Sequence, residues 1–414
     1  FFRCSFRSCS TMRCTKAFFQ RNHNFGPGPG ALFPVVMQRA QEQFRNFMGT
    51  GFSAIETTNL DATGSSHPGI PKVPVQYMLH ETTLKLKKTL AVPDNYRILF
   101  MSGGAVGQFS AIPLNLAFDG YTEGVKPKAD IVPVGYWSTR ARTETEKYCD
   151  VHYVLPPCVG TVPPVSSWDI RPDTQYVHIC LNETVQGLEI CREPDYDADR
   201  LPPLIADATS TLLSRPLDIT KYGAIYASGG KNIPHGITVV IIRDDLLLRK
   251  AHPFCPAVLH FNSHGAAIMP VGSAHDSIPN TPPVFPAWML GLTLDYIEES
   301  GGLQAMERQS IERANKIYGV IDKSEGFYYN PNEPEYRSRM SIGFRILKKT
   351  RQGEDDFDRD LEKNFLKEAE EEGFHYIFGH PVKGGMRATC YIGQTDEAVA
   401  DLVEFLQHFK AKSW

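Results

Sequence analysis

Short apolar runs alternate with segments of helical spacing along most of the chain. An apolar run of roughly 4–8 residues bounded by turn residues is typical of a buried strand, whereas apolar positions three and four apart predict an amphipathic helix. The apolar runs lie at 97–101, 131–134, 176–181, 204–206, 221–227 and 237–243. The helical patterns lie at 34–48 and 73–90, from 108 and 137 onward, and at 286–299. This alternation predicts an α/β fold with a mainly parallel sheet.

The pattern changes after a glycine pair at residues 301–302. A helix is predicted at 303–321, followed by strands and helices that form a compact α+β unit: 341–347, 355–372, 374–378, 386–392 and 395–411. We therefore predict a basic N-terminal segment (1–23), an N-terminal arm with a large domain (24–302), and a linking helix with a small C-terminal domain (303–414). No internal repeat is present.

Lys231 follows two glycines between two apolar strands. Gly229 and Gly230 allow the backbone to approach a bulky neighbour closely. An amine on such a turn is partly desolvated, and desolvation favours the neutral, nucleophilic form that covalent catalysis by lysine requires. On this stretch alone, a lysine on a surface hairpin is the favoured interpretation.

Asp207 gives Lys231 a partner, because it ends the apolar run that begins at Leu204. In α/β proteins, sites form at the carboxyl ends of strands. An aspartate and a lysine at neighbouring strand ends are the arrangement of pyridoxal 5'-phosphate (PLP) enzymes, in which the acid keeps the pyridine nitrogen protonated and the lysine carries the cofactor. The glycine turn 103–107 between a strand and a helix suits the cofactor phosphate, since free amides and the helix dipole point at it.

Several motifs in order resemble the phosphoserine aminotransferase family, class V aminotransferases of PLP fold type I. They are Asp-x-x-Ser-x-x-Leu-Ser-Arg-Pro from Asp207, Tyr-Gly-x-Ile-Tyr-Ala-x-x-x-Lys-Asn from Tyr222, and the segments 24–29, 103–115, 182–184, 280–283 and 384–388. The resemblance implies a large α/β domain with a mainly parallel sheet, a small α+β domain, and a homodimer. It also implies transfer of the amino group of glutamate to 3-phosphohydroxypyruvate, giving O-phosphoserine in serine biosynthesis.

The resemblance also implies roles for individual residues. Lys231 would hold PLP and move the proton, Asp207 would pair with the pyridine nitrogen, and Trp137 would stack on the ring. The remaining cofactor contacts would come from Gly104, Ala105, Val106, Thr184 and Gly230, and from Asn280 and Thr281 of the second subunit. The substrate would be bound by Arg387, His380 and Asn59.

The sequence departs from the family where the distal anion of the substrate would bind. The usual Ser-His-Arg is replaced at its last two positions by Asn59 and Leu60, and Gly-His-Arg becomes Gly379-His380-Pro381. The glutamine usually found before the lysine is Gly230, and His235 and Lys383 are candidates to restore positive charge. Two alternatives therefore stay open. One is a sister aminotransferase for another acidic oxo acid, and the other is an inactive structural relative, against which Asp207 and Lys231 argue.

Composition argues against several other classes of protein. A net charge of −4 argues against a nucleic-acid-binding protein, and no apolar run is long enough to span a bilayer. The nine cysteines form no Cys-x-x-Cys pair, and His260 and His264 lack neighbouring ligands, so we expect no metal site. The first segment is basic, rich in serine and free of acids, which is typical of a mitochondrial or plastid transit peptide. A disordered tail, or a start at Met12 in the cytoplasm, fits it too.

Overall fold

The computed structural model describes residues 22–57, 74–119, 122–265, 279–349 and 357–414. The predicted targeting segment therefore lies almost wholly outside the described residues. So do Asn59 and Leu60, on which part of the substrate interpretation depends.

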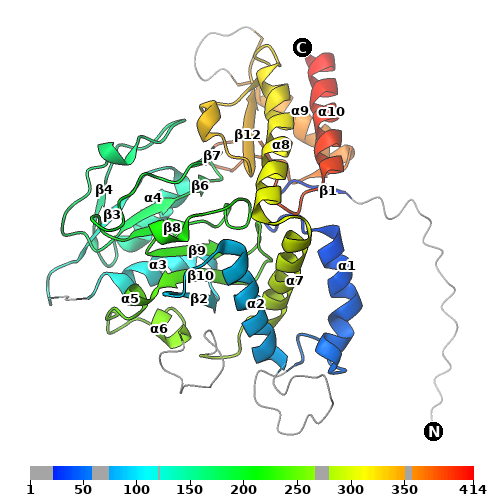
Figure 1. The fold of residues 1–414 in the computed structure, drawn as a ribbon. Helices are drawn as coiled ribbons and strands as arrows, with labels where there is room; N and C mark the ends of the chain where they lie inside the picture. The colour runs from blue at the N-terminus through cyan, green and yellow to red at the C-terminus, as the bar shows by residue number, and fades with distance from the viewer. Residues whose placement is uncertain (1–21, 58–73, 120–121, 266–278, 350–356) are drawn as a thin grey trace, which may run out of the picture.

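A seven-stranded sheet forms the centre of the large α/β part (Figure 1). Its strand order is β2-β10-β9-β8-β5-β3-β4, and only β10 runs antiparallel to its neighbours. The strands are β2 (Tyr96–Met101), β3 (Lys128–Ile131), β4 (Asp150–Tyr153), β5 (Val177–Cys180), β8 (Leu204–Asp207), β9 (Ala224–Ser228) and β10 (Thr238–Arg243). The predicted mainly parallel sheet is confirmed.

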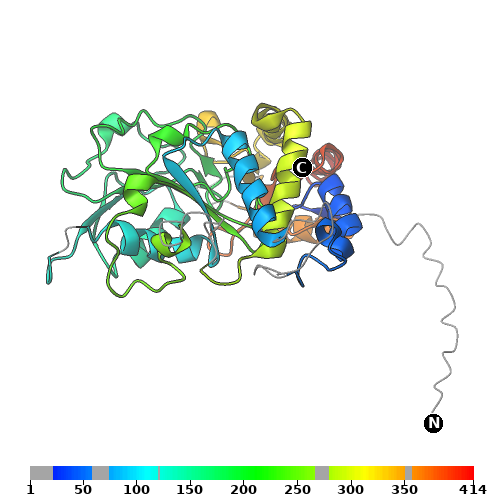
Figure 2. The same ribbon diagram turned by 60° about the horizontal axis from the view of Figure 1, so that its bottom comes forward.

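Both faces of the sheet are buried, as the unbroken apolar strands predicted. In β10, Val239 and Ile241 join one core with α2 (Pro74–Leu90) and α7 (Val284–Glu299), whereas Val240 and Ile242 join the opposite core. That second core contains residues of α3 (Gly104–Leu116), α4 (Tyr136–Thr145), α5 (Asp244–Leu247) and α6 (Phe261–His264). Figure 2 shows helices on both sides of the strands.

Several element boundaries differ from the sequence prediction for physical reasons. β3 ends at Ile131 instead of Val134, because Pro133 has no amide to donate to a ladder. The edge strand β4 was missed, since its half-exposed residues carry no long apolar run. The first helix α1 ends at Gln43, and Asn46 and Phe47 lie outside helical backbone angles. Helix α3 starts at Gly104, four residues before the predicted start.

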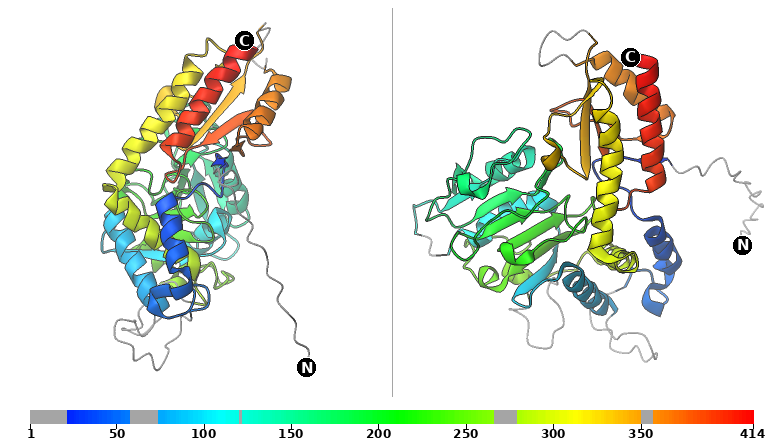
Figure 3. Two further views of the ribbon diagram at one scale, coloured as in Figure 1. Left: turned by 90° about the vertical axis from the view of Figure 1, so that its right-hand side faces the viewer. Right: turned by 45° about the horizontal axis from the view of Figure 1, so that its top comes forward.

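A third hydrophobic core lies in the C-terminal part (Figure 3). Helices α8 (Gly302–Asp322), α9 (Arg359–Glu371) and α10 (Asp396–Ser413) pack with a sheet of β11 (Tyr328–Tyr329), β12 (Ser341–Ile346) and β14 (Met386–Thr389). The predicted strand 374–378 is shorter, and as β13 (Phe374–His375) it pairs with β1 (His23–Asn24) of the N-terminal arm. Because Phe25 is also buried in this core, the arm is fixed to the C-terminal part.

The topology brings three strand ends to one edge of the central sheet. The carboxyl ends of β5, β8 and β9 lie there, and the hairpin of β6 (Asn182–Glu183) and β7 (Leu188–Glu189) follows β5 directly. The polar residues of these connections therefore gather in one place. Among the described residues, no helix is long and apolar enough to cross a bilayer.

Candidate active site

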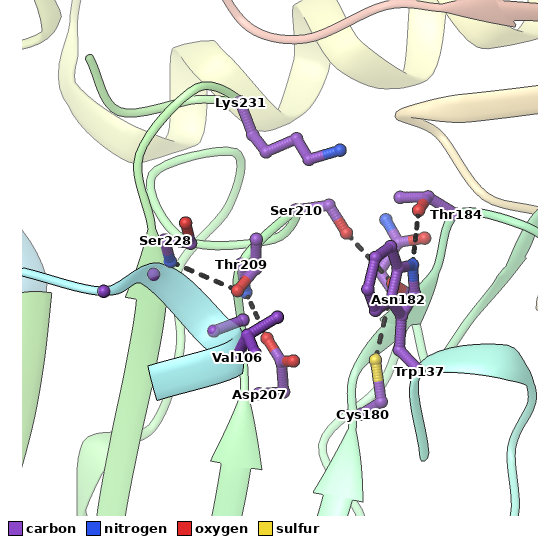
Figure 4. A pocket seen from close by; sticks show the side chains of 13 residues that line it. Val106, Trp137, Cys180, Asn182, Thr184, Asp207, Thr209, Ser210, Ser228 and Lys231 are labelled. Carbon is purple, nitrogen blue, oxygen red and sulfur yellow. Dashed lines mark hydrogen bonds between the residues drawn. The ribbon is translucent and has the colours of Figure 1, made fainter. Parts of the chain in front are cut away.

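Lys231 lies in the loop 229–237 that joins β9 to β10, which is longer than the predicted tight turn. Its half-buried side chain projects above a cavity at the strand ends (Figure 4). The amine donates a hydrogen bond to the carbonyl oxygen of Pro27 and lies 5.4 Å from the ring centroid of Tyr391. The structure therefore places the lysine at a site and excludes the surface-hairpin interpretation.

The glycine-rich arm passes over the lysine loop. The Gly30 amide donates to the Gly230 carbonyl at 2.9 Å, and the Tyr391 hydroxyl donates to the Pro27 carbonyl at 2.9 Å. Gly28 has a φ of 143°, and a Cβ there would lie 2.9 Å from the Gly230 oxygen. Only glycine allows this crossing, because any side chain would collide with the loop that carries Lys231.

Asp207 is the last residue of β8, and its side chain is almost completely buried. Burial raises the pKa of its carboxyl, while hydrogen bonds from Thr209 and Tyr226 and the charge of Lys231 oppose that rise. The Thr209 amide donates to Asp207 Oδ1 at 2.9 Å. A protonated ring nitrogen beside Asp207 would favour the ionised carboxylate further, since an opposite charge stabilises it.

A buried polar pair lies behind Asp207. The hydroxyl of Tyr226 is 2.8 Å from Nε2 of His178, and both side chains are inaccessible to solvent apart from a small part of the histidine. Burial lowers the pKa of His178 to about 4, so the ring is neutral at physiological pH. The sequence analysis missed this pair, although a histidine within the apolar run 176–181 was a visible signal.

The start of α3 forms another wall of the cavity. Gly103 and Gly104 have φ values of 94° and 63°, which turn the chain sharply from β2 into the helix. The first hydrogen bond of this helix joins the Gly107 amide to the Gly103 carbonyl. The amides of Ala105 and Val106 therefore have no partner within the helix, and the dipole adds positive potential there. This is a suitable place for a phosphate.

Trp137 and Thr184 form the opposite wall. The indole Nε1 of Trp137 donates to Thr184 Oγ1 at 3.0 Å (Figure 4). The backbone amide of Trp137 donates to the carboxylate of Glu183, which is completely buried. Burial raises the pKa of Glu183 to about 7, against hydrogen bonds from the α4 amides that lower it.

These walls enclose what we call the cofactor cavity, of about 220 Å³. It is lined by Gly103, Gly104, Ala105, Val106, Trp137, Cys180, Asn182, Thr184, Asp207, Thr209, Ser210, Ser228 and Lys231. An adjoining substrate cavity of about 360 Å³ shares three residues with it. It is lined by Pro27, Gly28, Pro29, Trp137, Thr184, Gly229, Gly230, Lys231, His235, His380 and Arg387.

Arg387 and His380 come from the C-terminal part. Arg387 on β14 is buried, and its Nη1 donates to the Thr184 carbonyl at 3.1 Å, while its Nε has no partner among the described residues. The Val382 amide donates to Nδ1 of His380, so the neutral ring carries its hydrogen on Nε2. Burial and the charge of Arg387 lower the pKa of His380. Beside Lys231 and His235, the substrate cavity is thus lined by the fixed cation of Arg387 and the neutral ring of His380.

The structure does not bring every predicted residue to these cavities. Asn280 and Thr281 are exposed before α7 and line neither cavity. Asn59 lies outside the described residues. His264 Nε2 contacts the Val258 carbonyl and His260 Nδ1 contacts Ser263, and the described part of the chain holds no cluster of metal-binding side chains.

The residues present fit PLP. The free amides of α3 suit its phosphate, Asp207 its ring nitrogen, Trp137 its ring face and Lys231 its aldehyde carbon. Asn182 Nδ2 is buried beside the cavity without a partner in the described structure, so a donor is available to an oxygen of the bound group. Sequence reasoning gave no role to Asn182, Thr209, Ser210 and Ser228, although their hydroxyl and amide groups follow the strand ends directly.

The neutral state of His178 predicts a specific pH dependence of stability. Its pKa is about 4 in the folded chain and near its ordinary 6.5 in the unfolded chain. The stability due to the neutral ring is therefore complete above pH 6.5 and is lost as pH falls towards 4. Between these pH values, we expect the unfolding free energy of the parent to drop by up to about 3 kcal/mol more than that of His178→Gln.

Urea denaturation at several pH values checks this expectation. His408→Gln, which removes an exposed histidine from α10, is the matched control and should follow the parent. Equal acid sensitivity of His178→Gln and the parent would contradict the account.

Comparisons with known proteins agree with this geometry. The family model of class-V aminotransferases matches residues 23–357. Phosphoserine aminotransferase from Bacillus circulans subsp. alkalophilus is 32% identical, with a TM-score of 0.81 over 95% of this chain and 99% of that chain. PLP-bound phosphoserine aminotransferase from Trichomonas vaginalis is also 32% identical, with a TM-score of 0.80 over 94% of this chain and 100% of that chain.

The fold is shared more widely. An alanine–glyoxylate aminotransferase from Nostoc sp. has a TM-score of 0.70 over 94% of this chain and 95% of that chain, at only 16% identity. The resemblance inferred from the motifs is therefore confirmed. The chain belongs to the class-V aminotransferase family.

Proposed function

We propose that the chain catalyses PLP-dependent transamination between glutamate and an acidic 2-oxo acid, with 3-phosphohydroxypyruvate as the first candidate. The observation that carries the proposal is the convergence of Asp207, Lys231 and the first turn of α3 on one cavity, with Arg387 in the adjoining one. When bound, PLP supplies an electron sink that stabilises negative charge at the substrate Cα.

The side chains of the cofactor cavity are placed to hold the cofactor, to orient its ring and to move a proton. Lys231 would hold the cofactor, and its amine is placed to take a proton from the substrate Cα. Asp207 holds the ring nitrogen protonated, because its buried carboxylate is stabilised by a cation. Trp137 would cover one face of the ring, and Thr184 would lie at its edge. Together with the arm over Lys231, these contacts limit the access of water.

Arg387 binds the α-carboxylate of the substrate. Its guanidinium is held at one end by the Thr184 carbonyl, and the side chain lines the substrate cavity. A planar guanidinium binds a carboxylate with two parallel hydrogen bonds, which fixes orientation as well as affinity. The same group serves glutamate and the amino acceptor, since both carry an α-carboxylate.

The distal end of the substrate site is less cationic. His380 is a neutral donor near pH 7, Pro381 carries no charge, and Lys383 is exposed. His235 lines the substrate cavity and is exposed to solvent. The two similar phosphoserine aminotransferases support phosphoserine as substrate, whereas the replaced distal positions favour a related acid. Hydrogen bonds to charged groups contribute roughly 1.5–3 kcal/mol each, so two lost arginines would weaken phosphate binding about a hundredfold to ten-thousandfold.

Replacing Lys231 tests the activity itself. We expect Lys231→Ala to fold, to bind PLP without the visible absorption of the parent, and to lose transamination by about a thousandfold or more, because both the covalent link and the proton carrier are gone. The measurement is 2-oxoglutarate formation from glutamate. Lys221→Ala, which removes a lysine outside both cavities, should behave as the parent. Turnover near the parental rate in Lys231→Ala would overturn the proposal, and a colourless parent that glutamate does not change would favour the inactive relative.

We also propose that the site is completed across a homodimer. Asn280 and Thr281 are exposed and line neither the cofactor cavity nor the substrate cavity of their own chain, which supports contact with the cofactor phosphate of a second copy. We expect Asn280→Ala to release PLP faster during gel filtration than the parent does. Sedimentation should show an active dimer, and a fully active monomer would rule out a shared site.

Substrate preference is tested in the reverse direction, with 2-oxoglutarate as amino acceptor. We expect phosphoserine to be used with a lower kcat/KM than at least one other acidic amino acid, because the distal site lacks its guanidinium groups. Pro381→Arg restores the Gly-His-Arg pattern and should raise kcat/KM for phosphoserine more than for glutamate. If phosphoserine is already the best substrate of the parent and Pro381→Arg changes nothing, the distal site binds phosphate by another route.

A further inference from the structure

Glu183 is a completely buried carboxylate on β6 that contacts neither cavity directly. Its Oε2 accepts a hydrogen bond from the Trp137 amide at 2.8 Å. Its Oε1 accepts from the Ser138 amide at 2.8 Å and from the Ser138 hydroxyl at 3.0 Å. All three bonds come from the first turn of α4. The carboxylate therefore does for this helix what a capping side chain does elsewhere.

The residue before α4 is built to admit this carboxylate. The N-cap of α4 is Gly135, which has no side chain to accept a hydrogen bond from the helix amides. A Cβ on Gly135 would lie 2.5 Å from Oε1 of Gln186 and 2.9 Å from Cδ of Glu183, so a larger residue would displace both side chains. The negative charge at the start of the helix also complements the helix dipole.

Thr184, the residue after Glu183, holds the indole of Trp137. Thr184 Oγ1 accepts from Trp137 Nε1, and the Thr184 carbonyl accepts from Arg387 Nη1. Two consecutive residues therefore fix Trp137 at its backbone and at its ring, and the second of them also contacts the arginine of the substrate cavity. The indole has few ways to rotate while these contacts hold.

We propose that Glu183 is a positioning residue that fixes Trp137 against the cofactor ring by capping α4 from a neighbouring strand. This inference rests on the proposed function, because it assumes that Trp137 stacks on PLP. Glu183 acts through Trp137 and touches neither substrate nor cofactor. The charged and titratable groups that act on it, Asp207 and Cys180, belong to the adjacent strand ends. Burial and the charge of Asp207 raise the pKa of Glu183, and the three donors that point at its oxygens oppose that rise.

The test compares Glu183→Gln with Glu189→Gln in the full chain. Glu189 is the other completely buried glutamate of the β6–β7 hairpin, and it pairs with Arg339 rather than with α4. The side-chain amide introduced by Glu183→Gln has one accepting oxygen, where the carboxylate has two. We therefore expect the dissociation constant of PLP to rise about tenfold in Glu183→Gln, and the circular dichroism of the bound cofactor to weaken. Glu189→Gln should lower the melting temperature without either change.

Trp137→Phe separates positioning from general destabilisation. If Glu183 acts through the indole, Glu183→Gln adds little to the loss of PLP affinity that Trp137→Phe already causes. Additive losses, or parental affinity and dichroism in Glu183→Gln, would overturn the inference. Should Glu183→Gln fail to fold, Glu183→Asp decides: its shorter carboxylate cannot span both amides, so parental affinity would again contradict the role. A parent that does not bind PLP would overturn the proposed function and this inference together.

Discussion

The buried carboxylate of Asp207 is the group on which the rest of the site depends. An ionised carboxylate away from water is expensive unless donors and an opposite charge surround it. The protein supplies the Thr209 amide and, behind the carboxylate, the Tyr226–His178 pair. It leaves the carboxylate close to the cavity beneath Lys231. The cationic ring nitrogen of a bound cofactor would complete this environment, so cofactor binding and compensation of the buried charge would be one interaction.

The fold makes this arrangement possible by joining segments far apart in the sequence. The N-terminal arm reaches Lys231 through the Pro27 carbonyl, and it is itself held by Thr389, whose hydroxyl donates to the Phe25 carbonyl at 2.8 Å. Arg387 enters from the C-terminal sheet and contacts Thr184 of the large part. Lys231 and Arg387 are thus held by parts of the chain with different hydrophobic cores, and both line the cavity that we propose for the substrate.

Much of this could be predicted from the sequence, because strand ends and glycine turns have strong local signals. The apolar run before Asp207 and the glycine turn before Ala105 placed both residues at the correct edge of the sheet. The contacts of His178 and Glu183 could not be predicted in this way. Each depends on a partner on another element, and hydrophobic periodicity does not indicate which polar side chains will meet. The division of the chain at residue 302 and the roles given to individual site residues stay predictions.

The most direct test of the account asks which amine carries the cofactor. Treating the PLP-loaded protein with borohydride makes the bond between lysine and cofactor permanent, and peptide mass spectrometry then locates it. The account predicts that the cofactor mass is found on the peptide containing Lys231, in close to one copy per chain. Its attachment to a different lysine, or its absence from every peptide, would contradict the assignment of Lys231 and with it the proposed site.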